Sequence, residues 1–182
     1  MSRKGIFVWL ALPVLALVAA NARAACAPSC PTTTASGAIS STIMGPVTVA
    51  MVTNLAFGTI VRPATSAGNG TVSIVASSGS RTVGGTALPL ASASASRAQF
   101  TITGEGASSV GVSTPGSISL TSGANTLTVT LSRSPSTSPQ TLSGSAGSDG
   151  TKTIFVGGSF PLTNATVPGA YTGSMTLTAT YQ

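Results

Sequence analysis

The sequence predicts an all-β fold, either a sandwich or a barrel, and three observations support this prediction. From Val47 onwards, short segments alternate apolar and polar side chains with the period of two that is typical of half-buried strands. Turn-forming residues separate these segments. No segment beyond the N-terminal region shows the apolar stripe of an amphipathic helix.

The first 24 residues have the three parts of a secretory signal peptide. Arg3 and Lys4 give the positive start, residues 6–20 form an apolar run, and Ala22-Arg23-Ala24 is an A-x-A cleavage site. A single-pass anchor is the alternative, but the run is shorter than the roughly twenty residues that span a bilayer. We therefore expect cleavage before Ala25, export, and release of one domain with an N-terminal extension.

Cys26 and Cys30 are the only two cysteines of the chain. Because an exported chain enters an oxidising compartment, we expect a local disulfide between them. So short a loop would contribute little to the stability of the whole fold. A redox or metal site is the weaker alternative, because the spacing is not C-x-x-C and the chain contains no histidine.

Residues 31–46 differ from the rest in their low complexity and lack of aromatic side chains. A flexible leader is the simplest interpretation. However, Ile39 and Ile43 share their parity with Val47, Val49 and Met51, so the segment could also lie extended with one apolar edge. We place the extension at residues 25–46 and the β-sandwich domain at residues 47–182.

The expected strands follow one another in short segments through the domain. They cover residues 47–52, 71–76, 97–103, 110–113, 117–120, 126–132, 152–156, 159–163 and 171–181. Turns with positive φ are expected at Asn69-Gly70, Gly84-Gly85, Asp149-Gly150 and Gly157-Gly158, and a further turn at Pro115-Gly116. Threonine and serine dominate the polar faces, so few charges protect the sheet edges from pairing with another strand.

The ionisable residues argue against catalysis and nucleic-acid binding. Without the signal, five basic residues and two acidic residues remain, too few for a phosphate-tracking surface. Histidine is absent, which excludes Ser-His and Cys-His nucleophiles. Glu105 lies between two glycines, and Asp149 precedes one. We therefore expect Glu105 to be a solvated loop residue and Asp149 to be a turn former, rather than the two carboxylates of a glycosidase.

The glycine-rich loops do not fit a phosphate site. In "GSAGSDGTKT" the order is Gly-Thr-Lys, and "GEGASS" lacks the third glycine of a dinucleotide fingerprint. We therefore predict a protein that is not an enzyme and has no cofactor, no metal, no small-molecule substrate and no nucleic-acid partner.

The C-terminal segment "GAYTGSMTLTATYQ" alternates cleanly, so one of its faces should cover a core. Its apolar positions are Tyr171, Met175, Leu177, Ala179 and Tyr181. Gly169 is the fourteenth residue from the end and Tyr181 is penultimate. This pattern resembles the C-terminal signature of chaperone-usher pilins, in which such a strand is gripped by a periplasmic chaperone.

Five blocks extend the resemblance over most of the domain. They are "NLAFGTIV", "GTVSIVASSGSRTVGG", "AQFTITGEG", "FVGGSFPL" and "PGAYTGSMTLTATY". In this order they resemble a family of exported bacterial β-proteins of unknown function (DUF4402-like), which is similar to chaperone-usher fimbrial subunits.

The resemblance to pilins implies an immunoglobulin-like antiparallel β-sandwich that lacks its final strand. The acceptor edge would comprise Gly169 and the five apolar residues of the C-terminal segment. The donor would be the extension of the next subunit, with Ile39 and Ile43 entering the groove and Gly45 permitting close approach.

The function implied is that of a structural subunit of a bacterial surface fimbria, a homopolymer formed by donor-strand exchange. Its partners would be a periplasmic chaperone and an outer-membrane usher, and it would pass through the periplasm to the cell surface. A monomeric secreted β-sandwich that acts as a binding or adhesion module is the alternative.

Overall fold

The computed structural model of the protein describes residues 33–64, 68–90 and 94–182. The regular structure in these ranges is entirely β, so the predicted all-β class is confirmed. None of their segments is a helix that could span a bilayer. The predicted signal peptide and the predicted disulfide between Cys26 and Cys30 lie outside the described residues.

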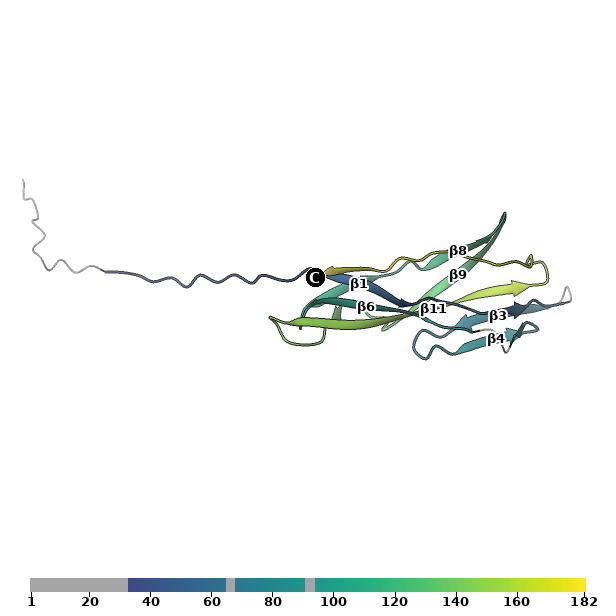
Figure 1. Cartoon of the computed structure of the whole chain (residues 1–182), viewed down its shortest axis with the longest axis horizontal. Helices are drawn as coiled ribbons and strands as arrows, with labels where there is room; N and C mark the ends of the chain where they lie inside the picture. Colours follow the sequence, from purple (N-terminus) through teal and green to yellow (C-terminus); the bar gives the residue numbers. More distant parts are fainter. Residues whose placement is uncertain (1–32, 65–67, 91–93) are drawn as a thin grey trace, which may run out of the picture. The chain divides into compact units, whose positions relative to one another are not determined.

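The chain divides into two units, residues 1–41 and residues 42–182, and all the strands belong to the second. Most of them form one antiparallel sheet of seven strands (Figure 1). Five strands follow one another across it in the order β1 (Thr48–Thr53), β6 (Ala98–Glu105), β11 (Asp149–Thr163), β3 (Asn69–Ile74) and β4 (Arg81–Gly85). β9 (Asn125–Ser134) also pairs with β11, and β8 (Ser117–Ser122) pairs with β9.

Two smaller sheets complete the second unit. One has three strands in the order β10 (Gln140–Thr141), β7 (Ser109–Ser113) and β12 (Thr178–Tyr181), and the other pairs β2 (Ile60–Val61) with β5 (Leu88–Pro89). Ile102 and Ile154 of the large sheet form a core cluster with Val110 and Val112 of β7. The two sheets therefore pack as the layers of a β-sandwich.

Two strands were predicted at residues 152–156 and 159–163, but the structure has a single strand of 15 residues there, β11. The turn predicted at Gly157-Gly158 is therefore wrong. Residues of β11 up to Val156 pair with β6, and those from Gly158 onwards pair with β3. A Cβ on Gly157 would overlap the carbonyl oxygen of Ile74 and lie 2.7 Å from the amide nitrogen of Ala76. The glycine therefore permits a close approach between backbones where the strand changes partner.

The other predicted turns are correct in part. Asn69-Gly70 and Asp149-Gly150 each begin a strand, because both pairs are held by neighbours in the large sheet. Gly85 does have a positive φ, of 74°. Pro115-Gly116 connects β7 to β8 as predicted.

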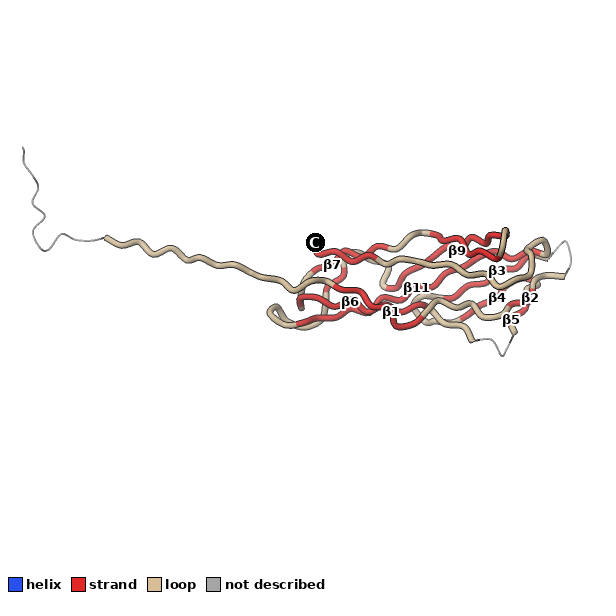
Figure 2. The backbone as a smooth tube through the Cα atoms, turned by 45° about the horizontal axis from the view of Figure 1, so that its top comes forward, coloured by secondary structure: helices blue, strands red, loops and turns tan. Residues whose placement is uncertain are grey.

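The C-terminal segment keeps the predicted alternation of faces but is not one continuous strand. Tyr171, Met175, Leu177, Ala179 and Tyr181 are half-buried, and the residues between them are exposed. Only β12 and an isolated bridge at Thr172 have β pairing, so most of the run before β12 is drawn as loop (Figure 2). A strand requires a paired neighbour, and this run has one only at those two places.

Candidate functional site

An open groove with a volume of about 1090 Å³ runs along the sandwich between two chain segments. One side is formed by residues 51–62, which we call the first lip. The other side is formed by residues 166–175, the second lip. A groove of this size between two backbone segments could receive a ligand or an extended peptide.

The floor of the groove is apolar because three strands of the large sheet direct one face toward it. The floor residues are Ile118 and Leu120 of β8, Leu127 of β9, and Phe160 and Leu162 of β11. Their alternation with serine and threonine places every second side chain of these strands on this face.

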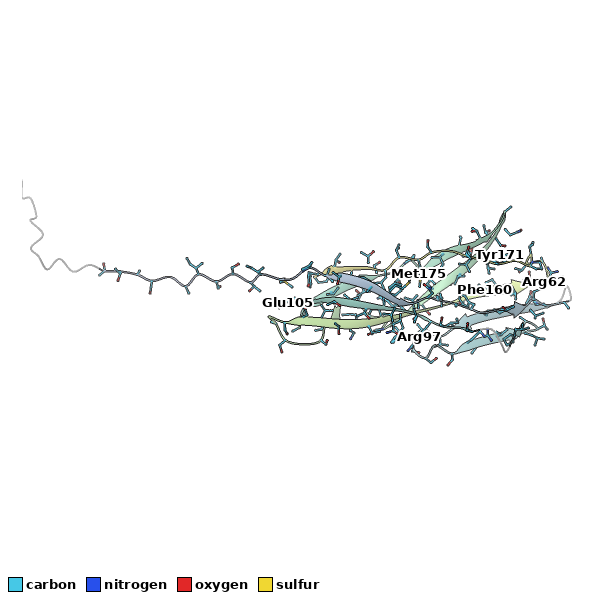
Figure 3. All side chains as sticks on the ribbon, viewed as in Figure 1. Arg62, Arg97, Glu105, Phe160, Tyr171 and Met175 are labelled. Atoms are coloured by element: carbon cyan, nitrogen blue, oxygen red, sulfur yellow. The ribbon has the colours of Figure 1, made fainter. Side chains whose placement is uncertain are left out.

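Aromatic side chains cover part of the floor. Phe57 of the first lip meets Phe160 edge to face, with ring centroids 4.9 Å apart and an interplanar angle of 82°. Phe160, Tyr171 and Met175, which Figure 3 labels, also line the groove. The groove is therefore lined by large apolar groups suited to the burial of aliphatic side chains.

The backbone of the first lip is held from its outer side. Ala56 exchanges two backbone hydrogen bonds with Ser96, at 2.9 and 2.8 Å. The Arg81 guanidinium donates to the carbonyl of Phe57 at 3.0 Å, and the amide of Leu90 donates to the carbonyl of Thr59 at 3.1 Å. None of these three partners lines the groove.

The second lip is held in the same manner, at Thr172. This residue exchanges backbone hydrogen bonds of 2.8 and 3.0 Å with Thr121 of β8, which lies outside the groove. Within the described ranges, no backbone hydrogen bond joins one lip to the other. Both lips therefore leave backbone groups with which a further strand in the groove could pair.

The edge of the large sheet next to the groove is also uncovered. Val49 and Met51 of β1 lie opposite Ile102 and Phe100 of β6, so all four side chains share the inner face of the sheet. Ile102 and Phe100 are 0% and 6% exposed, but Val49 and Met51 are 38% and 59% exposed. The layer that covers β6 therefore covers β1 only in part.

Hydrogen bonds between side chains and backbone connect the two sides at each end of this region. At one end, the Arg62 guanidinium donates to the carbonyls of Asn164 and Thr166, at 2.7 and 2.8 Å. At the other end, the hydroxyl of Tyr181 donates to the carbonyl of Gly45 at 2.9 Å and accepts from the amide of Glu105 at 2.7 Å. The C-terminus accordingly lies beside the start of β1 (Figure 1).

The residues predicted for the acceptor edge fall into two groups. Gly169, Tyr171 and Met175 line the groove. Leu177, Ala179 and Tyr181 instead pack against the core cluster formed with β6, β7 and β11. A Cβ on Gly169 would overlap the hydroxyl of Ser122 of β8, so a larger residue there would make this side chain rotate away.

The residues predicted for the donor are exposed. Ile39 and Ile43 are 99% and 90% exposed, and residues 33–45 contain no strand. No atom lies within 4 Å of the position that a Cβ on Gly45 would occupy.

Several groove residues were not predicted as site residues from the sequence. Phe57 belongs to the block "NLAFGTIV" and Arg62 directly follows it, but this block supported only the family resemblance. Phe160 was assigned to a strand without a role. Gly104, whose missing side chain leaves space for the Tyr181 ring, was also missed, because the space depends on a contact between distant segments.

Most of the charged side chains that the structure describes form hydrogen bonds with backbone groups of loops. Like Arg62 and Arg81, Arg97 and Arg133 donate to backbone carbonyls, and Arg97 also lies over the Phe155 ring, 3.5 Å from its centroid. The carboxylate of Glu105 accepts from the amide of Gly147, so the prediction of a solvated loop residue is wrong: Glu105 ends β6 and holds a neighbouring loop. The described residues contain no group of three potential metal ligands.

The fold and the groove together define the protein as a β-sandwich with an open, largely apolar groove along it. The chain belongs to the family described as "Domain of unknown function (DUF4402)", whose sequence profile matches residues 47–181. No curated protein and no solved structure matches the chain significantly.

Proposed function

We propose that the protein is a structural subunit of a bacterial surface fimbria that assembles by strand exchange between copies. One observation carries this proposal: an apolar groove lies between two lips whose backbone hydrogen bonds are made on their outer sides. A groove of this kind fits an extended peptide, which adds backbone hydrogen bonds along its edges and buries alternate side chains in the floor.

The extension of a second copy is the occupant that the chain itself offers. Residues 33–45 carry no charge and no aromatic side chain, and they form no strand of their own. Ile39 and Ile43 share a face of an extended chain and would stand about 13 Å apart along it. Burial of these two exposed side chains on the apolar floor would contribute about 2 kcal/mol each.

The resulting contact joins two different surfaces, the extension of one copy and the groove of the next. Such a head-to-tail contact leaves a free groove at one end and a free extension at the other, so it produces a filament rather than a closed dimer. This supports a role in a fibre without cofactor or catalysis.

The exposed groove also requires protection before assembly. A half-buried apolar floor between two lips whose backbones do not pair with each other favours aggregation. A periplasmic chaperone that fills the groove, and an outer-membrane usher that exchanges the chaperone for the next subunit, would meet this requirement for a chain exported by its signal peptide.

Truncation of the extension tests the proposal. The chain without its signal (residues 25–182) should form fibres visible by electron microscopy, and a truncated chain that begins at Val47 should not. In a mixture, the truncated chain still offers a groove, so it should cap growing fibres and shorten them. The matched control keeps residues 25–182 but has a scrambled sequence of the same composition at residues 33–45. The scrambled sequence separates the two isoleucines by an odd number of positions, so that they lie on opposite faces of an extended chain.

Fibres formed equally well by the truncated chain would contradict the donor assignment. A stable monomer at all concentrations, with the groove filled by its own extension or left empty, would instead favour a secreted monomeric binding module.

A further inference from the structure

At one end of the groove, the side chain of Arg62 connects the first lip to the second by hydrogen bonds. One nitrogen, Nη1, donates to the carbonyls of both Asn164 and Thr166, which are more than 100 residues away in the sequence. Arg62 ends the first lip, and Thr166 begins the second. In the described chain this side chain is the one that joins the ends of the two lips by hydrogen bonds.

The two carbonyls are presented by a well-ordered turn. The amide of Thr166 donates to the carbonyl of Thr163 at 3.1 Å, and the amide of Thr163 donates to the hydroxyl of Thr166 at 3.1 Å. Hydrogen bonds from a guanidinium to carbonyls are charge-assisted and stronger than those between neutral groups. Arg62 therefore holds the first lip at a defined place relative to a turn that is itself fixed.

An empty groove of this composition has a strong tendency to close. No backbone hydrogen bond joins its lips within the described ranges, and its floor carries the half-buried side chains of Ile118, Leu120 and Leu127 beside the buried Phe160 and Leu162. Direct pairing of the lips would bring them to about 4.8 Å, whereas a strand between them requires about twice that separation. The Arg62 side chain occupies the space between the lips at their shared end, where direct pairing would have to expel it.

We propose that Arg62 is a spacer that keeps the empty groove open at the width of one strand, so that an incoming extended segment finds it ready to pair. This proposal rests on the proposed function, but it concerns the empty state and can be tested without assembly. Its effect should fall on the rate of strand capture, because a groove that is closed most of the time binds in proportion to its open fraction.

Hydrogen exchange measures the state of the lips directly. The experiment uses residues 25–182 with Ile39→Asp and Ile43→Asp, which removes the apolar donor side chains without shortening the chain. In this background, Arg62→Ala should slow the exchange of amides in residues 54–61 and 169–177, because the lips pair with each other. A merely structural role for Arg62 would have the opposite effect, since local loosening speeds exchange.

Arg97→Ala is the matched control. Arg97 also donates to two loop carbonyls, those of Ala76 and Ser77, but neither residue lines the groove. Figure 3 shows Arg97 apart from the labelled groove residues. The control should leave exchange in both lips unchanged. Unchanged or faster exchange in the Arg62→Ala variant would overturn the spacer proposal.

A second measurement separates this proposal from the proposed function. A labelled synthetic peptide with the sequence of residues 33–45 is added to the same proteins, and its capture is followed by fluorescence anisotropy. Arg62→Ala should slow capture about tenfold, and Arg97→Ala should not. If the protein with Arg62 captures no peptide, strand exchange fails as a function, while the exchange data still decide whether Arg62 holds the groove open.

Discussion

At the scale of single residues, Tyr181 has a role that its position in the sequence does not reveal. The penultimate tyrosine was predicted to lie at an edge that contacts a partner, and within its own subunit its half-buried ring packs against a core cluster and over Gly104. Its hydroxyl joins three segments: the C-terminus, the end of β6 at Glu105, and the root of the extension at Gly45. Because the carbonyl of Gly45 is held by its own subunit, we expect the donated segment to extend no further than this residue.

Removal of this hydroxyl should destabilise the domain measurably. In Tyr181→Phe the ring is kept, but the half-buried amide of Glu105 and the carbonyl of Gly45 lose a partner, at a cost of about 1–2 kcal/mol. Urea unfolding monitored by circular dichroism measures the change. Tyr171→Phe is the matched control: its hydroxyl donates to the nearby carbonyl of Val167 at an exposed site, so its loss should cost about 0.5 kcal/mol or less. Equal losses in the two variants would contradict the proposed link.

At the scale of elements, the strands that were predicted correctly include central ones such as β6 and edge ones such as β1 and β8, because the prediction depends on local alternation. β6 shows buried and half-buried residues in strict alternation, and its sequence alternates in the same way. β11 was divided in two because Gly157-Gly158 has the composition of a turn. Sequence does not distinguish a glycine pair in a turn from one that permits close backbone contact, since both depend on the missing side chain.

Substitution in this glycine pair tests the explanation. Gly157→Ala would place a Cβ against the backbone of Ile74 and Ala76, which cannot move without disturbing β3, so we expect a loss of about 2–3 kcal/mol in the free energy of unfolding. Gly116→Ala is the control, because no atom lies within 4 Å of the added Cβ and its φ is not positive. Thermal and urea unfolding measure both. A Gly157→Ala variant as stable as the control would show that the close approach does not constrain this position.

At the scale of the whole molecule, sequence could predict the class of the fold but only part of the candidate site. The alternation in residues 171–181 correctly indicated which side chains face inward, because this depends on local periodicity alone. The first lip was not predicted, because residues 54–59 have little β pairing and their role depends on the segment across the groove. The groove forms where two segments that are distant in the sequence come together, and neither segment carries a local pattern that indicates the other.

The scarcity of charge in the molecule leads to a prediction about assembly. Residues 33–45 carry no charge, and the groove has one charged side chain, Arg62, which already donates to two carbonyls. Strand exchange should therefore depend on apolar burial and backbone hydrogen bonds, with little contribution from ion pairs. Between about 0.05 and 0.5 M sodium chloride, the assembly constant measured by light scattering should change less than about twofold, since screening acts only on charged contacts. Ammonium sulfate at the same ionic strength should strengthen assembly, because excluded salts favour the burial of apolar surface. A fall of about tenfold with sodium chloride would instead place the assembly contact on the arginines of the loops.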